Sequence, residues 1–338
     1  MKAVRLVLAA TSAATSLTLG VTGAESATER SESLKVGLVT QAASLGDRSA
    51  GHLIYLGVRR AAKELDVTAR VLTPGPKEGF APSLAYLGRQ RFELVIAGFL
   101  EDPRVVDSMA QKFPRTMFVM PDIPHELLPH RPNNVRNLLF REEQIGYLVG
   151  YLASRMEQRR PGRDVVSAVG GASIPQVDHF LAGFRAGARK GNQRTTVLID
   201  YANDFLDPRK CRAVALSQIA RGSGAVFQVA AACGFGALAA ARSKGVWGIG
   251  VDTDQSYLGS HILTSAVKRE DVAVFETIRS FRNGTLTRGG NSYFTLANGG
   301  LGLGRISPKV PAAIVAEVER VRQRIVAGTI RNIPTTVR

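Results

Sequence analysis

The chain has 338 residues, of which 45% are hydrophobic and 21% are charged. This composition is typical of a globular protein with sizeable cores and excludes a disordered or low-complexity chain. The length is sufficient for two ordinary domains, and a formal charge of +16 at pH 7 points to a cationic surface or an anionic partner.

The first residues have the layout of a secretory signal peptide. A basic start with Lys2 and Arg5 precedes an apolar run over residues 6–21, and small residues follow up to Ala24. We predict that residues 1–24 are a signal peptide cleaved after Ala24 and that the mature protein is exported. A membrane anchor is the alternative, but the run is short and is interrupted by Thr and Ser. No cysteine lies near the cleavage site, so we expect no lipid anchor.

From residue 34 onwards, apolar runs rich in β-branched residues alternate with segments of helical spacing. In the segment 52–65, for example, Ile54, Val58, Ala61 and Leu65 repeat as on one face of a helix. The first half contains four predicted strands, 34–41, 68–74, 92–99 and 115–122, which alternate with three predicted helices, 52–65, 80–90 and 105–113.

The alternation restarts beyond a junction near residues 132–136. The second half contains four helices, 140–158, 176–191, 208–222 and 236–245, and four strands, 164–171, 195–201, 224–236 and 246–255. A strand over 260–270, a helix over 271–284, an extended stretch over 291–304 and a helix over 309–328 complete the chain.

This order predicts an α/β protein with two doubly wound parallel-sheet lobes joined by hinge crossovers. The final elements do not begin a third domain; they suggest that the chain crosses back between the lobes. We place the first lobe at 35–134 plus about 266–298, and the second at 135–265 plus about 299–334.

Ligands of open parallel sheets bind beyond the carboxyl ends of the strands, so residues at those ends are candidate binding residues. These are Gln41, Asp47, Gly98, Asp122, Gly170, Gly171, residues 232–234 and Asp252. Singly, each has a structural explanation, since Asp47 could cap a helix and Asp122 follows a turn-forming proline. Their shared edge favours a binding cleft. Ionised carboxylates only accept hydrogen bonds, which suits a ligand rich in hydroxyl groups.

The turn after the strand 246–255 raises a separate question. Asp252, Asp254 and Gln255 could be metal ligands, an acid/base pair or ordinary turn residues. The chain has no G-x-S-x-G elbow, no H-E-x-x-H pair and no phosphate-binding glycine motif. We therefore expect a binding protein without catalytic residues, metal or cofactor, with a metal-dependent nucleoside hydrolase as the less favoured alternative.

The two cysteines and the distribution of the basic residues remain to be interpreted. Cys211 and Cys233 could form a disulfide in an exported chain, but the sequence does not show that they meet, and we favour free thiols. The basic residues are spread over helices and loops, and no nucleic-acid-binding motif accompanies them. We expect no nucleic-acid partner. Association with an anionic cell envelope and a solvated cationic face are equally good explanations of the charge.

At this point the chain resembles a known family, the BMP family (basic membrane proteins, including bacterial purine-nucleoside receptors). The resemblance extends over residues 36–334 and implies a type I periplasmic-binding-protein fold and a substrate-binding protein of an ABC transporter. It is carried by eight stretches: LVIAGF, FVMPD, FREEQIGYLVGYLA, VGGASIPQVDHFLAGFRAG, YANDFLDPRKC, WGIGVDTDQ, ILTSAVKRED and IVAGTIRNIP.

The resemblance also implies roles for particular residues. Asp122 would hold a ligand hydroxyl or base edge, and Phe180 would pack on the ligand, although a core position is the alternative for Phe180. Asp252 would accept hydrogen bonds from ribose hydroxyls. Lys268 would contact the ligand or close the cleft, and the turn up to Gly234 would bring its backbone to the ligand.

The first loop departs from the family pattern. Asp47 and Ser49 remain, but the aromatic residue that would stack on a purine is Ala50, and its polar neighbour is Gly51. Losing one stacking wall removes about 1–3 kcal/mol of binding energy. The resemblance implies a monomer that binds a nucleoside or sugar-like molecule and serves an ABC permease and ATPase. An extracellular sensor without transport is the alternative.

Overall fold

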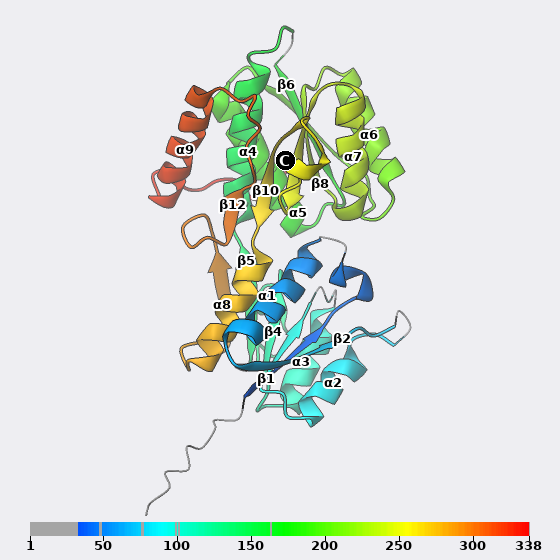
Figure 1. Ribbon diagram of the computed structural model, residues 1–338, viewed down its shortest axis with the longest axis vertical. Coiled ribbons are helices and arrows are strands. Elements are labelled where there is room, and N and C mark those ends of the chain that lie inside the picture. The colour runs from blue at the N-terminus through cyan, green and yellow to red at the C-terminus, as the bar shows by residue number, and fades with distance from the viewer. Residues whose placement is uncertain are drawn as a thin grey trace, which may run out of the picture. The chain divides into compact units, whose positions relative to one another are not determined.

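The computed structural model describes residues 33–46, 49–75, 78–98, 100, 102–162 and 164–337 (Figure 1). The predicted signal peptide lies outside these residues. The body Ser33–Arg338 contains two six-stranded sheets with helices on both faces, which confirms the predicted α/β class. None of the helices within the described ranges combines the length and the apolar character needed to cross a membrane.

The first sheet has the strand order β11-β5-β4-β3-β1-β2, and all its strands are parallel. Its strands are β1 (Leu34–Val39), β2 (Val67–Leu72), β3 (Leu94–Ala97), β4 (Met117–Pro121), β5 (Val135–Phe140) and β11 (Asn291–Phe294). Successive residues of the buried strands face opposite cores, because side chains alternate along a strand. In β3, Leu94 packs with α1 (Ala50–Glu64) and α8 (Glu270–Arg282), whereas Val95 packs with α2 (Ala81–Arg89) and α3 (Pro103–Lys112).

The second sheet has the order β12-β10-β9-β8-β6-β7, which matches the first sheet strand for strand. Only its edge strand β12 is antiparallel. Its strands are β6 (Val165–Gly170), β7 (Thr196–Tyr201), β8 (Ala225–Val229), β9 (Trp247–Asp252), β10 (Ile262–Lys268) and β12 (Leu301–Leu303). The helices on its faces are α4 (Glu142–Glu157), α5 (Pro175–Gly191), α6 (Pro208–Ala220), α7 (Ala231–Ser243) and α9 (Ala312–Val326). Short 3-10 turns occur at η1 (Ala42–Leu45), η2 (His125–Leu127) and η3 (Ser256–Leu258).

The lobe boundaries that we placed from the sequence differ from the strand pairing at two points. Val135–Phe140 pairs with β4 of the first sheet, whereas α4, which follows, packs on α5 beside the second sheet. Likewise, β10 stays in the second sheet to Lys268, and α8 then packs on α1. The chain therefore crosses after Phe140 and after Lys268, where β5 and β10 end.

A close contact between α4 and α5 depends on glycine. Gly146 and Gly150 of α4 face carbonyl oxygens of α5, and Gly183 and Gly187 of α5 face carbonyl oxygens of α4. A Cβ atom at any of these positions would overlap the facing backbone. The absence of side chains lets the two backbones touch directly, as in the small-residue helix contacts of membrane proteins.

A disulfide joins α6 and α7. The sulfur atoms of Cys211 and Cys233 are bonded, and the Cα atoms lie 5.5 Å apart. Our expectation of free thiols was therefore wrong. Cys233 lies in the first turn of α7, not in the strand predicted over 224–236, and the packing of α6 on α7 brings it to Cys211.

Candidate ligand-binding site

Two aspartates end equivalent strands of the two sheets. Asp122 directly follows β4 and Asp252 ends β9, and both strands are third in the order of their sheets. Both residues have φ of 63°, in the left-handed region that Asp and Asn tolerate better than other non-glycine residues. Backbone strain of this kind is common at binding sites. Equivalent strands of the two sheets therefore end in an aspartate with the same left-handed backbone conformation.

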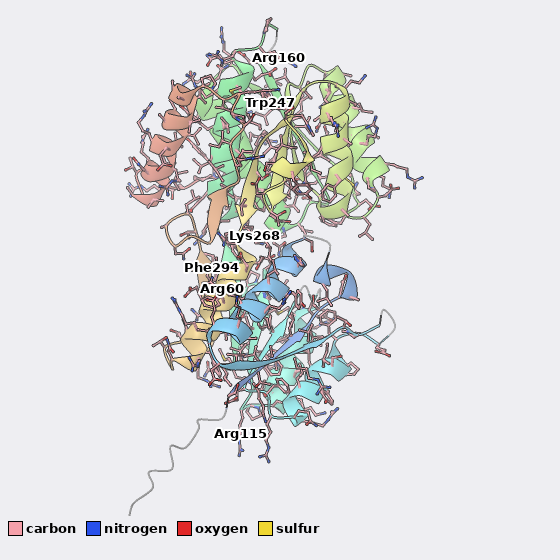
Figure 2. The ribbon with its side chains drawn as sticks, viewed as in Figure 1. Arg60, Arg115, Arg160, Trp247, Lys268 and Phe294 are labelled. Carbon is pink, nitrogen blue, oxygen red and sulfur yellow. A yellow bond between two sulfur atoms is a disulfide. The ribbon has the colours of Figure 1, made fainter. Side chains whose placement is uncertain are left out.

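Lys268, at the end of β10, is the centre of a buried ionic cluster. Its Nζ lies 2.6 Å from Oδ1 of Asp122, 3.1 Å from Oε1 of Glu142 and 3.3 Å from Oε1 of Glu270. It also lies 4.6 Å from the ring centroid of Phe140. The side chain of Lys268 is only 4% exposed, so water contributes little to its solvation. Figure 2 places this lysine in the region between the two sheets.

The cluster contains more acidic than basic side chains, and burial and neighbouring charges shift the pKa values of the acids in different directions. Burial alone would lower the pKa of Lys268, but Asp122, Glu142 and Glu270 hold it well above its usual value. Burial raises the pKa of Glu142, yet Lys268 and His179 outweigh this effect and leave it lowered. Burial and the charge of Asp122 hold the pKa of Glu270 well above its usual value. Glu270, which is fully buried, is therefore the carboxyl group that most readily keeps its proton.

Asp252 stands apart from this cluster. It is half-buried, and its carboxylate makes no hydrogen bond to any residue in the described ranges. Burial raises the pKa of Asp252 to about 6, with Lys268 opposing this effect and Asp122 and Glu142 adding to it. A desolvated carboxylate without a donor is costly, so this group is suited to accept hydrogen bonds from a bound molecule.

Two side chains of α5, Gln176 and His179, contact residues of this cluster. Nε2 of Gln176 donates to the backbone oxygen of Asp122 at 2.6 Å, and Nδ1 of His179 lies 3.2 Å from Glu142. Glu142, Glu143 and His179 have ligand atoms within 4.8 Å of one another, a spacing that could hold a cation. Oε1 of Glu142 already pairs with Lys268 at 3.1 Å, however, so a cation bound to this carboxylate would lie close to the positive charge of that lysine.

The structure places the other predicted residues as follows. Asp47 lies outside the described residues. Ser49 is the N-cap residue of α1, and Gly98 lies against Thr40 just after β3. Gly234 lies within α7, against the amide of Gln228, so the predicted turn is the first turn of a helix.

Phe180 belongs to the core in this structure. It is 3% exposed and packs edge-on against Phe227, with ring centroids 6.2 Å apart. This is the position that its helical spacing alone predicts, and it leaves no open face for stacking on a ligand. Gln255 is also buried, where it accepts a hydrogen bond from Gln228 at 3.0 Å and supports the turn after β9.

The sequence reasoning missed Glu142, Glu270, Gln176 and His179. A signal for the two glutamates was present. An Arg-Glu pair follows the crossover strand in both halves, at Arg141–Glu142 and at Arg269–Glu270. No comparable repeat marks Gln176 or His179.

Comparison with known proteins agrees with this arrangement. A family model described as Bmp, ABC transporter substrate-binding protein PnrA-like, matches residues 34–335. The chain belongs to the Bmp family. It is 30% identical over 303 residues to an uncharacterized lipoprotein of Pyrococcus horikoshii, with 85% of this chain and 73% of the relative covered.

A second relative of this Bmp-family chain is named ABC transporter nucleoside-binding protein BmpA, from Lactococcus lactis. The identity is 25% over 295 residues, which covers 80% of this chain and 81% of the relative. A crystal structure of an ABC transporter solute-binding protein from Aeropyrum pernix K1 superimposes with a TM-score of 0.75 at 24% identity. It covers 89% of this chain and 94% of that one, and it confirms the periplasmic-binding-protein fold. The Bmp family consists of solute-binding proteins of ABC transporters, which act outside the cytoplasmic membrane.

Proposed function

We propose that this Bmp-family chain binds a small hydroxylated ligand, a nucleoside or a sugar-like molecule, between its two lobes. The mature protein is exported and acts as a monomer. It delivers its ligand to an ABC permease and ATPase, and it catalyses no reaction.

The observation that carries this proposal is the carboxylate of Asp252. It lies at the carboxyl edge of the second sheet, without a hydrogen-bond donor in the described part of the chain. Vicinal hydroxyl groups of a ribose or a sugar would supply two donors to its two oxygens. The ligand would then satisfy a group that the protein itself leaves unsatisfied, and part of the binding energy would come from relieving that cost.

Asp122 and Lys268 have a supporting role in this proposal. Lys268 contacts three carboxyl groups of the protein. In this proposal it holds the side chain of Asp122 in place and does not contact the ligand itself. The backbone oxygen of Asp122 accepts a hydrogen bond from Gln176 of α5, which links the end of β4 to the second lobe. If the two lobes move when a ligand binds, this hydrogen bond would form or break, and the movement would thereby affect the backbone at the end of β4.

A thermal-shift series tests the proposal. We would measure the melting temperature with adenosine, guanosine, uridine, ribose, xylose and glucose, because a ligand stabilises the folded state by RT ln(1 + [L]/Kd). A binding compound should lose its shift in Asp252→Asn, with an affinity about 10- to 100-fold lower, since a charged hydrogen-bond acceptor is removed.

The matched control is Asp254→Asn in the same turn. Asp254 is exposed and accepts from the backbone amide of Ser256 at 3.1 Å, so it should keep ligand binding. No shift with any nucleoside or sugar would reject this ligand class. A shift that requires calcium or magnesium and disappears in Asp254→Asn would instead favour the nucleoside hydrolase.

A sensor without transport differs in a measurable way. Ala50 is buried at the start of α1, so the first loop offers no aromatic surface at this position, and weak binding to a purine would suit a sensor. Uptake of a radiolabelled form of the binding compound should fall in cells lacking this chain if it serves a transporter. Unchanged uptake would assign the sensor role.

A further inference from the structure

A hollow of about 340 Å³ lies in the second lobe at the edge opposite to the candidate site. Trp247, Gly259 and His261 line it at the amino ends of β9 and β10, whereas Asp252 and Lys268 lie at the carboxyl ends of the same strands. Figure 2 shows the same separation, with Trp247 far from Lys268. The hollow is therefore distinct from the site between the lobes.

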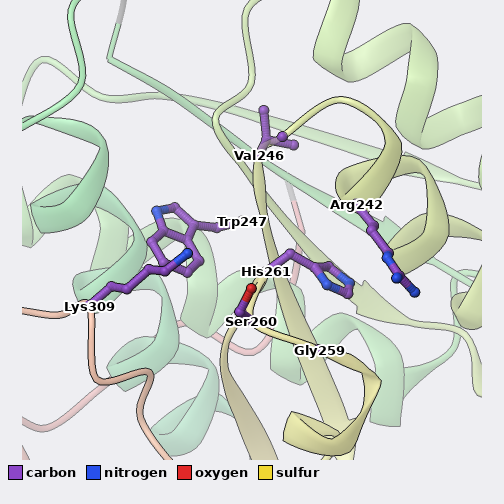
Figure 3. Close-up of a pocket in the computed structure, with 8 residues that line it drawn as sticks. Arg242, Val246, Trp247, Gly259, Ser260, His261 and Lys309 are labelled. Atoms are coloured by element: carbon purple, nitrogen blue, oxygen red, sulfur yellow. The ribbon is translucent and has the colours of Figure 1, made fainter.

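Two cationic side chains from separate segments line this hollow, on opposite sides of Trp247 and His261. Arg242 comes from the last turn of α7, and Lys309 comes from the segment between β12 and α9 (Figure 3). Both are exposed, and neither forms an ion pair with a residue in the described ranges. Among the described residues that line the hollow, none carries a carboxylate. The site thus concentrates positive charge that the protein does not neutralise.

A structural explanation accounts for only part of this charge. A cation in the last turn of α7 interacts favourably with the helix dipole, which is sufficient reason for Arg242. Lys309 is not part of that helix. Its Nζ lies 5.9 Å from the ring centroid of Trp247, where a cation–π contact holds it at the rim.

The remaining lining groups suit an oxyanion. Ser260 is exposed and carries a hydroxyl group, and His261 follows it just before β10. Burial and the charge of Arg242 lower the pKa of His261, so its ring is largely neutral at pH 7. The lining of the hollow therefore offers two exposed cations, a hydroxyl donor and an indole ring (Figure 3).

We propose that this hollow binds a phosphate group, held between Arg242 and Lys309, with the attached carbon skeleton against Trp247. Arginine and lysine are the usual phosphate ligands of proteins, and the hollow has the volume of a small-molecule pocket. The phosphate could belong to a soluble phosphate ester or to a lipid headgroup. The inference does not depend on the ligand proposed for the site between the lobes.

Trp247 makes the test direct, because it is the only tryptophan in the chain. Its fluorescence would be followed while inorganic phosphate, and separately glycerol phosphate, replaces chloride at constant ionic strength. The same protein would be sedimented with phosphatidylglycerol vesicles, with phosphatidylcholine vesicles as the neutral reference. The variant is Arg242→Glu/Lys309→Glu.

The control variant is Lys63→Glu/Arg115→Glu, which makes the same change in charge at exposed positions of the first lobe. We expect a saturable fluorescence change with phosphate, weakened about tenfold or more in Arg242→Glu/Lys309→Glu and unchanged in the control. Binding to phosphatidylglycerol vesicles alone, with the same pattern in the variants, would assign the phosphate to a lipid headgroup. Equal losses in both variants, or no response to either source, would overturn the proposal.

Discussion

Glu142 and Glu270 approach the same ammonium group from equivalent places in the two halves of the chain. Each is the first residue of the helix that follows a crossover strand, and their oxygens lie 3.1 and 3.3 Å from Nζ of Lys268. The preceding arginines, Arg141 and Arg269, have nearly the same backbone, with ψ of 63° and 64°. Both crossovers are thus joined through one lysine.

Replacing Lys268 by methionine should strongly destabilise the protein. The change leaves Asp122 and Glu142 with uncompensated buried charge, and breaking one side of a buried ion pair costs about 3–5 kcal/mol. Urea denaturation at pH 7 would measure the loss, with exposed Lys63→Met as the control. The double variant Lys268→Met/Glu142→Gln should lose less than Lys268→Met, because it removes one of these uncompensated charges. Equal midpoints for Lys268→Met and Lys63→Met would show that the cluster does not stabilise the fold.

Replacing Asp252 by asparagine should stabilise the unliganded protein at neutral pH. Because burial raises the pKa of Asp252 to about 6, the unfolded chain loses this proton at lower pH than the folded protein. The resulting cost is absent below about pH 4 and complete above about pH 6, and it amounts to at most about 3 kcal/mol. Asparagine removes the charge and tolerates the left-handed backbone at this position.

The check is the melting temperature of Asp252→Asn and of the unmodified protein at pH 4.5 and pH 7.5. The advantage of the variant should be large at pH 7.5 and small at pH 4.5. A variant that is less stable at both pH values would mean that the carboxylate has a partner within the protein.

Ligand affinity should rise with pH, although the ionisation of Asp252 lowers the stability of the unliganded protein over the same pH range. Only the ionised carboxylate of Asp252 accepts two hydrogen bonds from hydroxyl groups, so affinity should rise from pH 5 to pH 7.5. With a pKa of about 6, the ionised fraction increases roughly tenfold over this range. Calorimetric titration with the compound identified by thermal shift would measure it. An affinity independent of pH would exclude Asp252 as the acceptor.

Gly187→Ala should disturb the contact between α4 and α5. Its new Cβ atom would overlap the carbonyl oxygen of Tyr147, and backbone cannot move aside as a side chain can. Overpacking of this kind costs about 1–3 kcal/mol or more. Gly302→Ala is the control, because a Cβ there meets no described atom within 4 Å. Denaturant midpoints compare the two, and similar values would indicate that the helices separate easily.

Removing the disulfide should lower stability without changing the fold. The bond between Cys211 and Cys233 closes a loop with a sequence separation of 22, for which chain entropy accounts for about 3 kcal/mol. Cys211→Ser/Cys233→Ser and the protein reduced with dithiothreitol should melt at similar, lower temperatures. Titration of thiols in the unfolded, unreduced protein should find none. Two reactive thiols would show that the bond is not formed.

The sequence predicted the alternation of strands and helices well, because apolar periodicity is a local property. Residues such as Ile54 and Val58 repeat within one helix, Asp122 directly follows its strand, and Asp252 is the last residue of its strand. Contacts between distant segments were not predictable in this way. Lys268 and Asp122 are 146 positions apart, and no local pattern indicates that one lysine meets several carboxylates.

Phe180 and the cysteines show the same limit. An aromatic residue on a helix near a strand end is compatible with a ligand contact or with the core, and only the packing on Phe227 distinguishes them. Cys211 and Cys233 lie on two helices, and their pairing depends on how those helices pack.

Each sheet takes one of its two edge strands from the last part of the chain. β11 joins the first sheet beside β5, and β12 joins the second beside β10, although the two are neighbours in sequence. As the polypeptide emerges from the ribosome, the first sheet must therefore wait with an open edge beside β5 until five of the six strands of the second sheet have been made. An open edge can pair with other chains, so the interval before residue 291 emerges is when a chaperone would protect the nascent protein most effectively.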